Sequence, residues 1–126
     1  MLTLQIIETA YRATLEEQDD PVVWITHAMR GAGAELAVLL RGNAVNYAVT
    51  GQDCSGLQLG EWKQTQAPRL AADVAGLLGK GIEVLAIEDD LAERGIDQAV
   101  LIEGIALVSR ARLVEVLERF PRIWHW

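Results

Sequence analysis

The sequence has little cysteine and proline and a shortage of positive charge. Only one of its 126 residues is cysteine, and three are proline. A single cysteine excludes an intrachain disulfide and any metal site built from four cysteines. Lysine and arginine number 11 against 18 aspartates and glutamates, giving a formal net charge of −7. Because nucleic acid binding needs concentrated positive charge, direct binding of nucleic acid is not expected.

Long hydrophobic runs are also missing. No apolar stretch approaches the roughly 18 residues that a membrane-spanning helix needs, and the N-terminus lacks a basic region followed by a long apolar core. Apolar residues still make up 51% of the chain, which excludes disorder as a description of the whole. We therefore expect a cytoplasmic protein with no membrane segment, folded as one domain around a real core.

The most informative stretch runs from Gly81 to Ile96. Val84 to Ile87 form an apolar run that is too short for a helix and is typical of a strand buried on both faces of a parallel sheet. Glu88, Asp89 and Asp90 follow at once and suit the first turn of a helix, where the dipole favours negative charge. These acids either cap a short helix or belong to a site, because open α/β sheets bind ligands at the carboxyl ends of their strands.

Apolar runs and helical patterns alternate along the rest of the chain. Asp20-Pro21 opens a helix with an N-cap acid and a proline in the first turn, and Thr9 to Asp20 reads as a loop or irregular helical turn. Further helices are expected at Ala44–Val49, from Pro68 to Gly79, and after Ser109, which we expect to cap a helix ended by Pro121. The expected strands are residues 2–7, 36–40, 84–87 (taken as the central strand), 105–108 and 122–126. This alternation predicts an α/β fold with a single-domain, mostly parallel five-stranded sheet and helices on both faces.

Residues 50–68 interrupt the alternation. The segment holds Gln52, Gln58, Gln64, Gln66, Cys54, Trp62 and three glycines. It is about as long as a loop without regular structure becomes in a compact domain, so we expect it to be functional or to be ordered by a partner.

Polar side chains follow the carboxyl ends of several expected strands. If the sheet is parallel, these side chains converge at one edge: Thr9, Tyr11, Arg12, Arg41, Asn43, Glu88 and Asp89. They would form either a small pocket that tolerates anions or an ordinary solvated edge.

Other kinds of site find little support. His27 is more typical of a helix surface and His125 of an interface than of a metal ligand, and no His-x-x-x-His spacing is present. The sequence has no Ser-His-Asp arrangement, GxGxxG or P-loop, and no glycine- and hydroxyl-rich phosphate loop follows the first strand, which disfavours a flavin carrier. We expect neither a metal nor a cofactor.

Three stretches together resemble a known family. VLAIEDDLAERGI, LLRGNAVNYAV (Leu39 to Val49) and the ending IALVSRARLVEVLERFPRIWHW are similar in order and spacing to the DsrE/DsrF/DsrH sulfur-relay proteins, with DsrH or TusB as the most similar branch. The resemblance covers most of the chain from Ala34 onward, except residues 50–68, which look like an insertion. It implies a flavodoxin-like five-stranded sheet, assembly into oligomers, and transfer of sulfur between partner proteins as cysteine persulfides, as in tRNA thiolation or sulfur oxidation.

The chain departs from the family at its reactive residue. In DsrE-type members a cysteine ends the central strand, and the matching position here is Ile87. In DsrH-type members a cysteine can lie in the first crossover, and Ala10 to Ala34 contain none. Cys54 is therefore the only thiol that can carry sulfur, although the adjacent Asp53 would raise its pKa.

Two functions stay open on these grounds. One is a sulfur carrier that uses Cys54, and the other is a non-catalytic scaffold or small-ligand-binding subunit of the same fold. Trp62, Trp124 and Trp126 lie in a loop and a terminal strand, where aromatic residues are typical interface anchors. We therefore expect a homo-oligomer, as a dimer, trimer or hexamer.

Overall fold

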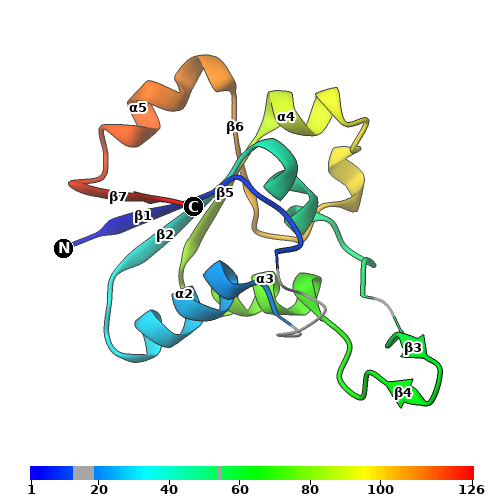
Figure 1. Cartoon of the computed structure of the whole chain (residues 1–126). Helices are drawn as coiled ribbons and strands as arrows, with labels where there is room; N and C mark the ends of the chain where they lie inside the picture. The colour runs from blue at the N-terminus through cyan, green and yellow to red at the C-terminus, as the bar shows by residue number, and fades with distance from the viewer. Residues whose placement is uncertain (13–18, 54) are drawn as a thin grey trace.

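The fold is a single parallel sheet covered by helices. We describe a computed structural model at residues 1–12, 19–53 and 55–126. The strands of the main sheet are β1 (Thr3–Ile7), β2 (Leu36–Leu40), β5 (Glu83–Ile87), β6 (Ala106–Val108) and β7 (Arg122–His125). They lie in the order β6-β5-β2-β1-β7, and every neighbouring pair is parallel (Figure 1). The predicted α/β class and the five parallel strands are confirmed.

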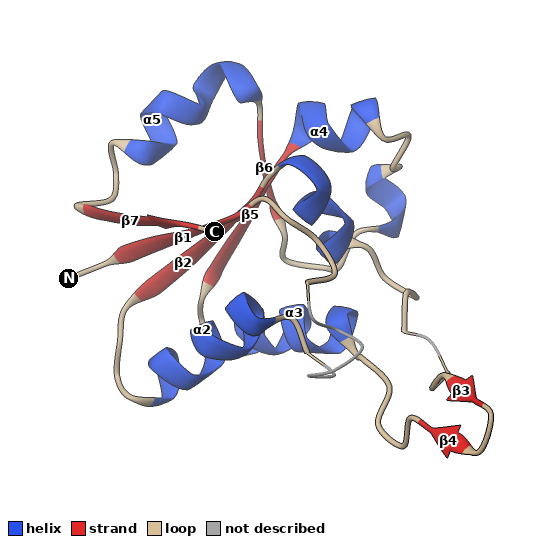
Figure 2. Ribbon diagram, viewed as in Figure 1, coloured by secondary structure: helices blue, strands red, loops and turns tan. Residues whose placement is uncertain are grey.

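Helices cover both faces of this sheet (Figure 2). One face carries α2 (Pro21–Gly31), α3 (Leu70–Gly79) and the 3-10 helix η1 (Gly42–Ala48), with α4 (Glu88–Glu93) following β5 directly. The opposite face carries α5 (Leu113–Leu117), which follows the 3-10 turn η3 (Arg110–Arg112). A further 3-10 turn, η2 (Gln98–Val100), follows α4.

β2 is apolar along its whole length and β5 is apolar from Val84 onward, because both faces of the sheet are buried at these two strands. Successive side chains of a strand point to opposite faces. Val84 and Ala86 of β5 therefore pack with α2, α3 and η1, while Leu85 and Ile87 pack with Val116 of α5. Each of the four β5 side chains is at most 2% exposed, as a continuous apolar run requires.

The N-terminus of α2 is fixed by Asp20, as the sequence predicts. One carboxylate oxygen accepts hydrogen bonds from the backbone N–H groups of Val22 at 2.8 Å and Val23 at 3.1 Å. The other accepts the hydroxyl of Tyr47 at 2.7 Å. Burial and the Asp20 carboxylate raise the pKa of Tyr47, which therefore stays a neutral donor. Asp20 thus ties α2 to η1 in addition to capping the helix.

Several expectations need correction. β5 is not the central strand, because β2 lies in the middle of the sheet and β5 lies between β2 and β6. The short helix expected at Ala44–Val49 is the 3-10 helix Gly42–Ala48. Ser109 precedes η3 but makes no capping hydrogen bond with its side chain.

The segment of residues 50–68 is not without regular structure. It contains a short antiparallel hairpin of β3 (Gln58–Leu59) and β4 (Trp62–Lys63), which extends away from the sheet in Figure 1. Cys54 lies outside the described residues, as does most of the stretch between Thr9 and Asp20. In the part of the chain that the structure describes, no helix has the length and apolar character to cross a bilayer.

Candidate functional site

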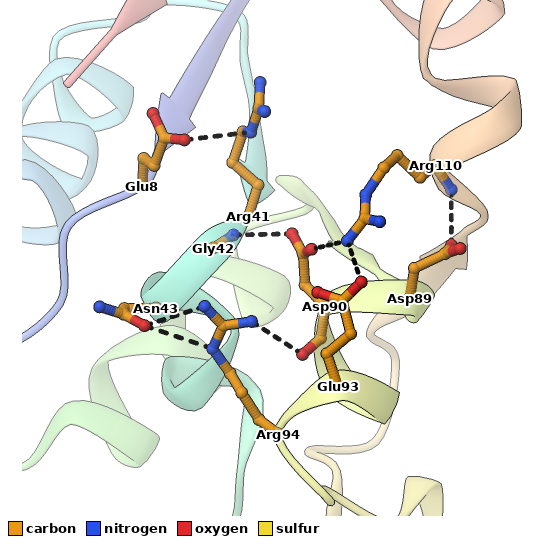
Figure 3. A network of polar contacts seen from close by, with 9 residues as sticks. All are labelled: Glu8, Arg41, Gly42, Asn43, Asp89, Asp90, Glu93, Arg94 and Arg110. Carbon is orange, nitrogen blue, oxygen red and sulfur yellow. Dashed lines mark hydrogen bonds and ion pairs between the residues drawn. The ribbon is translucent and has the colours of Figure 1, made fainter.

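The carboxyl ends of β2, β5 and β6 meet in a polar network centred on Asp90 (Figure 3). Asp90 belongs to the first turn of α4 and is 7% exposed. One carboxylate oxygen accepts the Gly42 N–H at 2.7 Å, and the other accepts the Arg110 guanidinium, which also contacts Glu93 at 2.9 Å. Gly42 stands at the start of η1 after β2, and Arg110 follows β6, so one carboxylate joins three neighbouring strand ends.

Charge and hydrogen bonding keep Asp90 ionised. Burial by itself would raise its pKa, but the Gly42 N–H and the Arg110 guanidinium more than offset that effect, and the pKa lies below its ordinary value. Arg94 adds a hydrogen bond from its guanidinium to the Asp90 carbonyl oxygen at 3.1 Å. Asp90 is therefore a permanent anion at neutral pH rather than a proton donor.

Gly42 can approach Asp90 because its backbone adopts φ +55°, a left-handed conformation that favours glycine. A Cβ at this position would also meet Glu8 Cγ at 3.3 Å. Glu8 follows β1 and lies against Arg41 at 3.5 Å and His125 of β7 at 2.7 Å. A second group of charges thus continues the network across β1 and β7.

The predicted ligand-binding residues fall into separate groups. Arg41 and Asn43 flank Gly42, and Asn43 accepts the Arg94 guanidinium at 2.9 Å. Asp89 accepts the Arg110 N–H at 2.7 Å, whereas Glu88 turns to Gln98 at 3.0 Å.

Tyr11 lies away from the acids of α4. Its hydroxyl is 3.0 Å from the side chain of Gln52, and its ring packs edge-to-face on Tyr47 with centroids 5.3 Å apart. Thr9 and Arg12 are exposed. The seven residues therefore do not share one set of contacts, and those from β2 and β5 lie nearest to the Asp90 network.

Asp90 and Arg110 were missed as site residues by the sequence reasoning. Asp90 was treated only as part of an acidic first turn. Arg110 follows the end of β6 by two residues, so the rule that selected Arg41 and Asp89 also selects it. What the sequence could not supply was the pairing between these two side chains, which are 20 positions apart.

The acids at the end of β5 are engaged in contacts within the protein. Ile87 is 1% exposed and packs in the core. It stands at the position that the resemblance matches to the strand-end cysteine of DsrE-type proteins. The acids that follow it, Glu88, Asp89 and Asp90, all have hydrogen-bonding partners. Among the described residues, no three His, Cys, Asp or Glu side chains are grouped so that they could hold a metal ion.

Comparison with known proteins gives the fold and no family. No protein-family model matches the chain, and no curated protein sequence matches it. Among solved structures, the chain is similar to the YchN protein from E. coli, with a TM-score of 0.70, 17% identity and coverage of 100% of both chains.

Two proteins of unknown function are similar to the same degree. One is MTH1491 from Methanobacterium thermoautotrophicum, with a TM-score of 0.65, 16% identity and coverage of 99% of this chain and 97% of that one. The other is BT1422 from Bacteroides thetaiotaomicron, with a TM-score of 0.68, 16% identity and coverage of 98% and 94%. These full-length likenesses, together with the sheet order, place the chain in one fold with all three proteins.

Proposed function

We propose that this protein is a subunit of an intracellular sulfur-relay assembly of the DsrE/DsrH type. Support comes from the parallel five-stranded sheet, which the resemblance implies, and from the motifs VLAIEDDLAERGI and LLRGNAVNYAV, which supply β5–α4 and β2–η1. In this proposal the Asp90 network keeps the strand ends in a fixed arrangement for a partner protein. Fold likeness alone does not give function, so the assignment depends on the residues of the site.

The observation that defines the subunit's role is the buried Ile87 at the end of β5. An alkyl side chain cannot accept sulfur, and the neighbouring acids are engaged in internal contacts. The strand-end site therefore serves recognition, and any sulfur must travel on Cys54, the single thiol.

The proposed sulfur transfer to Cys54 balances in atoms and electrons without a further reactant. The Cys54 thiolate attacks the outer sulfur of a donor persulfide, a new S–S bond forms on Cys54, and the donor leaves as a thiolate. No external oxidant is needed, because the sulfane sulfur only changes its carrier.

Intact-protein mass spectrometry tests this step. Incubation with a persulfidated donor protein is expected to add about 32 Da, one sulfur atom, to the wild type at Cys54. Cys54→Ser removes the only thiol and is expected to abolish the added mass. A wild-type protein that gains no mass from an active donor would contradict the carrier role.

A non-catalytic scaffold is the second candidate, and the saturated contacts of Glu88, Asp89 and Asp90 favour it. The acidic neighbour Asp53 also favours it, because a nearby carboxylate disfavours a thiolate. This candidate predicts no added mass and equal binding of relay partners by wild type and Cys54→Ser. Size-exclusion chromatography with the candidate partner distinguishes it from the carrier, for which Cys54→Ser blocks onward transfer.

Oligomerisation belongs to the same proposal. β7 is an edge strand, paired with β1 alone, and Ile123 and Trp124 of β7 and the following Trp126 are exposed by 36% to 40%. The backbone of Trp126 hydrogen-bonds to Ile6 of β1 and to Glu8 just after it, so the alternation of a strand turns the N–H groups of Ile123 and His125 outward. An aromatic edge with free N–H groups is a surface that proteins normally cover.

A further inference from the structure

A second polar cavity lies far from the Asp90 network along the chain and is not used by the proposed function. It has a volume of about 520 Å³ and is lined by residues of the segment before α2, the base of the hairpin and the start of α3. The side chains that define its chemistry are Asp19, Gln64, Thr65, Gln66, Arg69 and Asp73. A cavity of this size is large enough for a small metabolite.

One wall of the cavity is fixed by close backbone packing. The Gln64 N–H donates to the Leu57 carbonyl oxygen at 2.8 Å, and the Gln64 side-chain oxygen accepts the Leu57 N–H at 3.2 Å. A Cβ on Gly56 would lie only 2.3 Å from the Gln64 carbonyl oxygen, so this contact requires glycine. These contacts hold the base of the hairpin in a defined conformation.

The cavity lining also includes a carboxylate, Asp73, whose hydrogen bonding is incomplete. Oδ2 of Asp73 is buried and has no hydrogen-bond partner among the described residues, which is costly for a charged oxygen. Burial and the neighbouring Asp19 carboxylate raise the pKa of Asp73 to about 6, with a smaller contribution from Asp53 and an opposing one from His27. Among the described residues, no lysine or arginine pairs with Asp19 or Asp73, and Asp73 takes up a proton as the pH falls below about 6.

Arg69 supplies a positive charge to the same cavity. It lines the same cavity four residues before Asp73, is exposed, and pairs with no acid in the described part of the chain. Within the described residues, the cavity therefore combines two carboxyl groups that pair with no lysine or arginine, a guanidinium that pairs with no acid, and the amides of Gln64 and Gln66.

We propose that this cavity binds a small zwitterion of the α-amino acid class. The ligand's ammonium group pairs with Asp19 and Asp73, and its carboxylate pairs with Arg69, for which a guanidinium is well suited. The amides and the Thr65 hydroxyl receive a polar side chain. Such a ligand meets both unpaired charges at once, which a simple cation or anion does not.

The test uses L-serine with two analogues that each lack one charged group. NMR titration of the ¹⁵N-labelled protein is expected to show shifts of the amides of residues 64–73 with L-serine, and at least about tenfold weaker binding of ethanolamine and of 3-hydroxypropionate. Equal affinity for ethanolamine would overturn the amino acid assignment. Shifts confined to other residues, or none, would overturn the site.

Variants and the pH dependence of binding distinguish ligand binding by these residues from a purely structural role. Arg69→Gln is expected to weaken L-serine about tenfold and to leave ethanolamine unchanged, because only the carboxylate contact is lost. Lys80→Gln, at the other end of α3, is the matched control and is expected to change neither affinity.

The affinity for L-serine is expected to rise about tenfold from pH 5 to pH 7.5, because the ligand's ammonium competes with a proton that leaves near pH 6. Asp73→Asn is expected to weaken binding and to remove this pH dependence. An affinity that is independent of pH in the wild type would overturn the exchange of proton for ammonium.

Discussion

Asp90 shows how one side chain can hold several elements together. It is buried, its carboxylate bridges the Gly42 N–H and the Arg110 guanidinium, and its pKa lies below the ordinary value. Removing an ionised partner leaves the donors it satisfied unpaired, which costs more than the hydrogen bonds themselves contribute. The stability of the strand ends therefore depends on the charge of this residue.

Asp90→Asn is expected to lower the free energy of unfolding by about 2 kcal/mol at pH 7, because hydrogen bonds to a charged acceptor contribute about 1.5–3 kcal/mol. Since the folded-state pKa is lowered, the contribution of Asp90 is present above its unfolded pKa of about 3.9 and is lost as pH falls below it. Urea unfolding should show a lower free energy of unfolding for Asp90→Asn than for the wild type at pH 7, and equal values at pH 3. Glu118→Gln, at an exposed position, serves as the control, and an equal loss at both pH values would contradict the charge-based explanation.

Asp73 behaves in the opposite way. Its folded-state pKa is raised to about 6, so its stabilising contribution is present below the unfolded pKa and is lost as pH rises through 6. Asp73→Asn removes the repulsion from Asp19 and is expected to stabilise the protein by about 1 kcal/mol at pH 8, after allowance for solvent screening of a half-buried group.

The measurement for Asp73→Asn is thermal unfolding at pH 5 and pH 8. The variant should gain a few degrees over the wild type at pH 8 and about half as much at pH 5, which lies between the unfolded and folded pKa values. A variant less stable than the wild type at pH 8 would show that Asp73 is not strained by its neighbour.

At the scale of elements, β5 supports both layers of the protein. Its side chains alternate between the helices of one face and α5 of the other, and Ile87 leads directly into α4. A strand of this kind cannot place a charge in its interior, because both faces are dry between Val84 and Ile87. This explains why its charged residues lie at the two ends, with Glu83 before the buried run and Glu88 after it.

Leu85→Asp is expected to prevent folding, because an unpaired buried carboxylate costs several kcal/mol against a total stability of roughly 5–15 kcal/mol. Leu85 is 2% exposed and lies between β2 and β6, whereas Leu59 of the hairpin is 63% exposed and gives the matched control Leu59→Asp. Circular dichroism should show loss of structure in the first variant and none in the second. A folded Leu85→Asp protein would mean that β5 is not buried as described.

At the scale of the whole molecule, the exposed tryptophans belong to different elements of the fold. Trp124 lies on the edge strand β7 and Trp126 directly after it, while Trp62 belongs to the hairpin and Trp24 to α2. The edge of β7 differs from the others in combining aromatic side chains with backbone groups available for pairing, which is the combination typical of an interface.

Trp124→Lys is expected to convert an oligomer into a chain of 13.8 kDa, because a charge on an edge strand opposes pairing with another copy. Light scattering at micromolar concentration should give at least twice that mass for the wild type. Trp24→Lys, at a more exposed tryptophan of α2, should leave the mass unchanged. A wild type that scatters as a monomer would contradict the oligomer proposal.

Local pattern alone determined the strands of the sheet and the start of α2. Leu36 to Leu40 was identified as a strand with the bounds observed, and Asp20-Pro21 as the start of α2, because burial periodicity and helix capping involve residues near in sequence. The α/β class followed from the alternation of these elements.

Tertiary structure decided which strand ends meet and which charges pair. The middle position of β2, the pairing of Asp90 with Arg110 and the neighbouring of Asp19 and Asp73 all join residues 20 or more positions apart. No local period encodes such contacts, because they depend on the order in which strands pack and on the shape left between helices. The sequence therefore specified the buried strands and their acidic ends, and the packed fold determined which of those acids are satisfied and which still lack a partner.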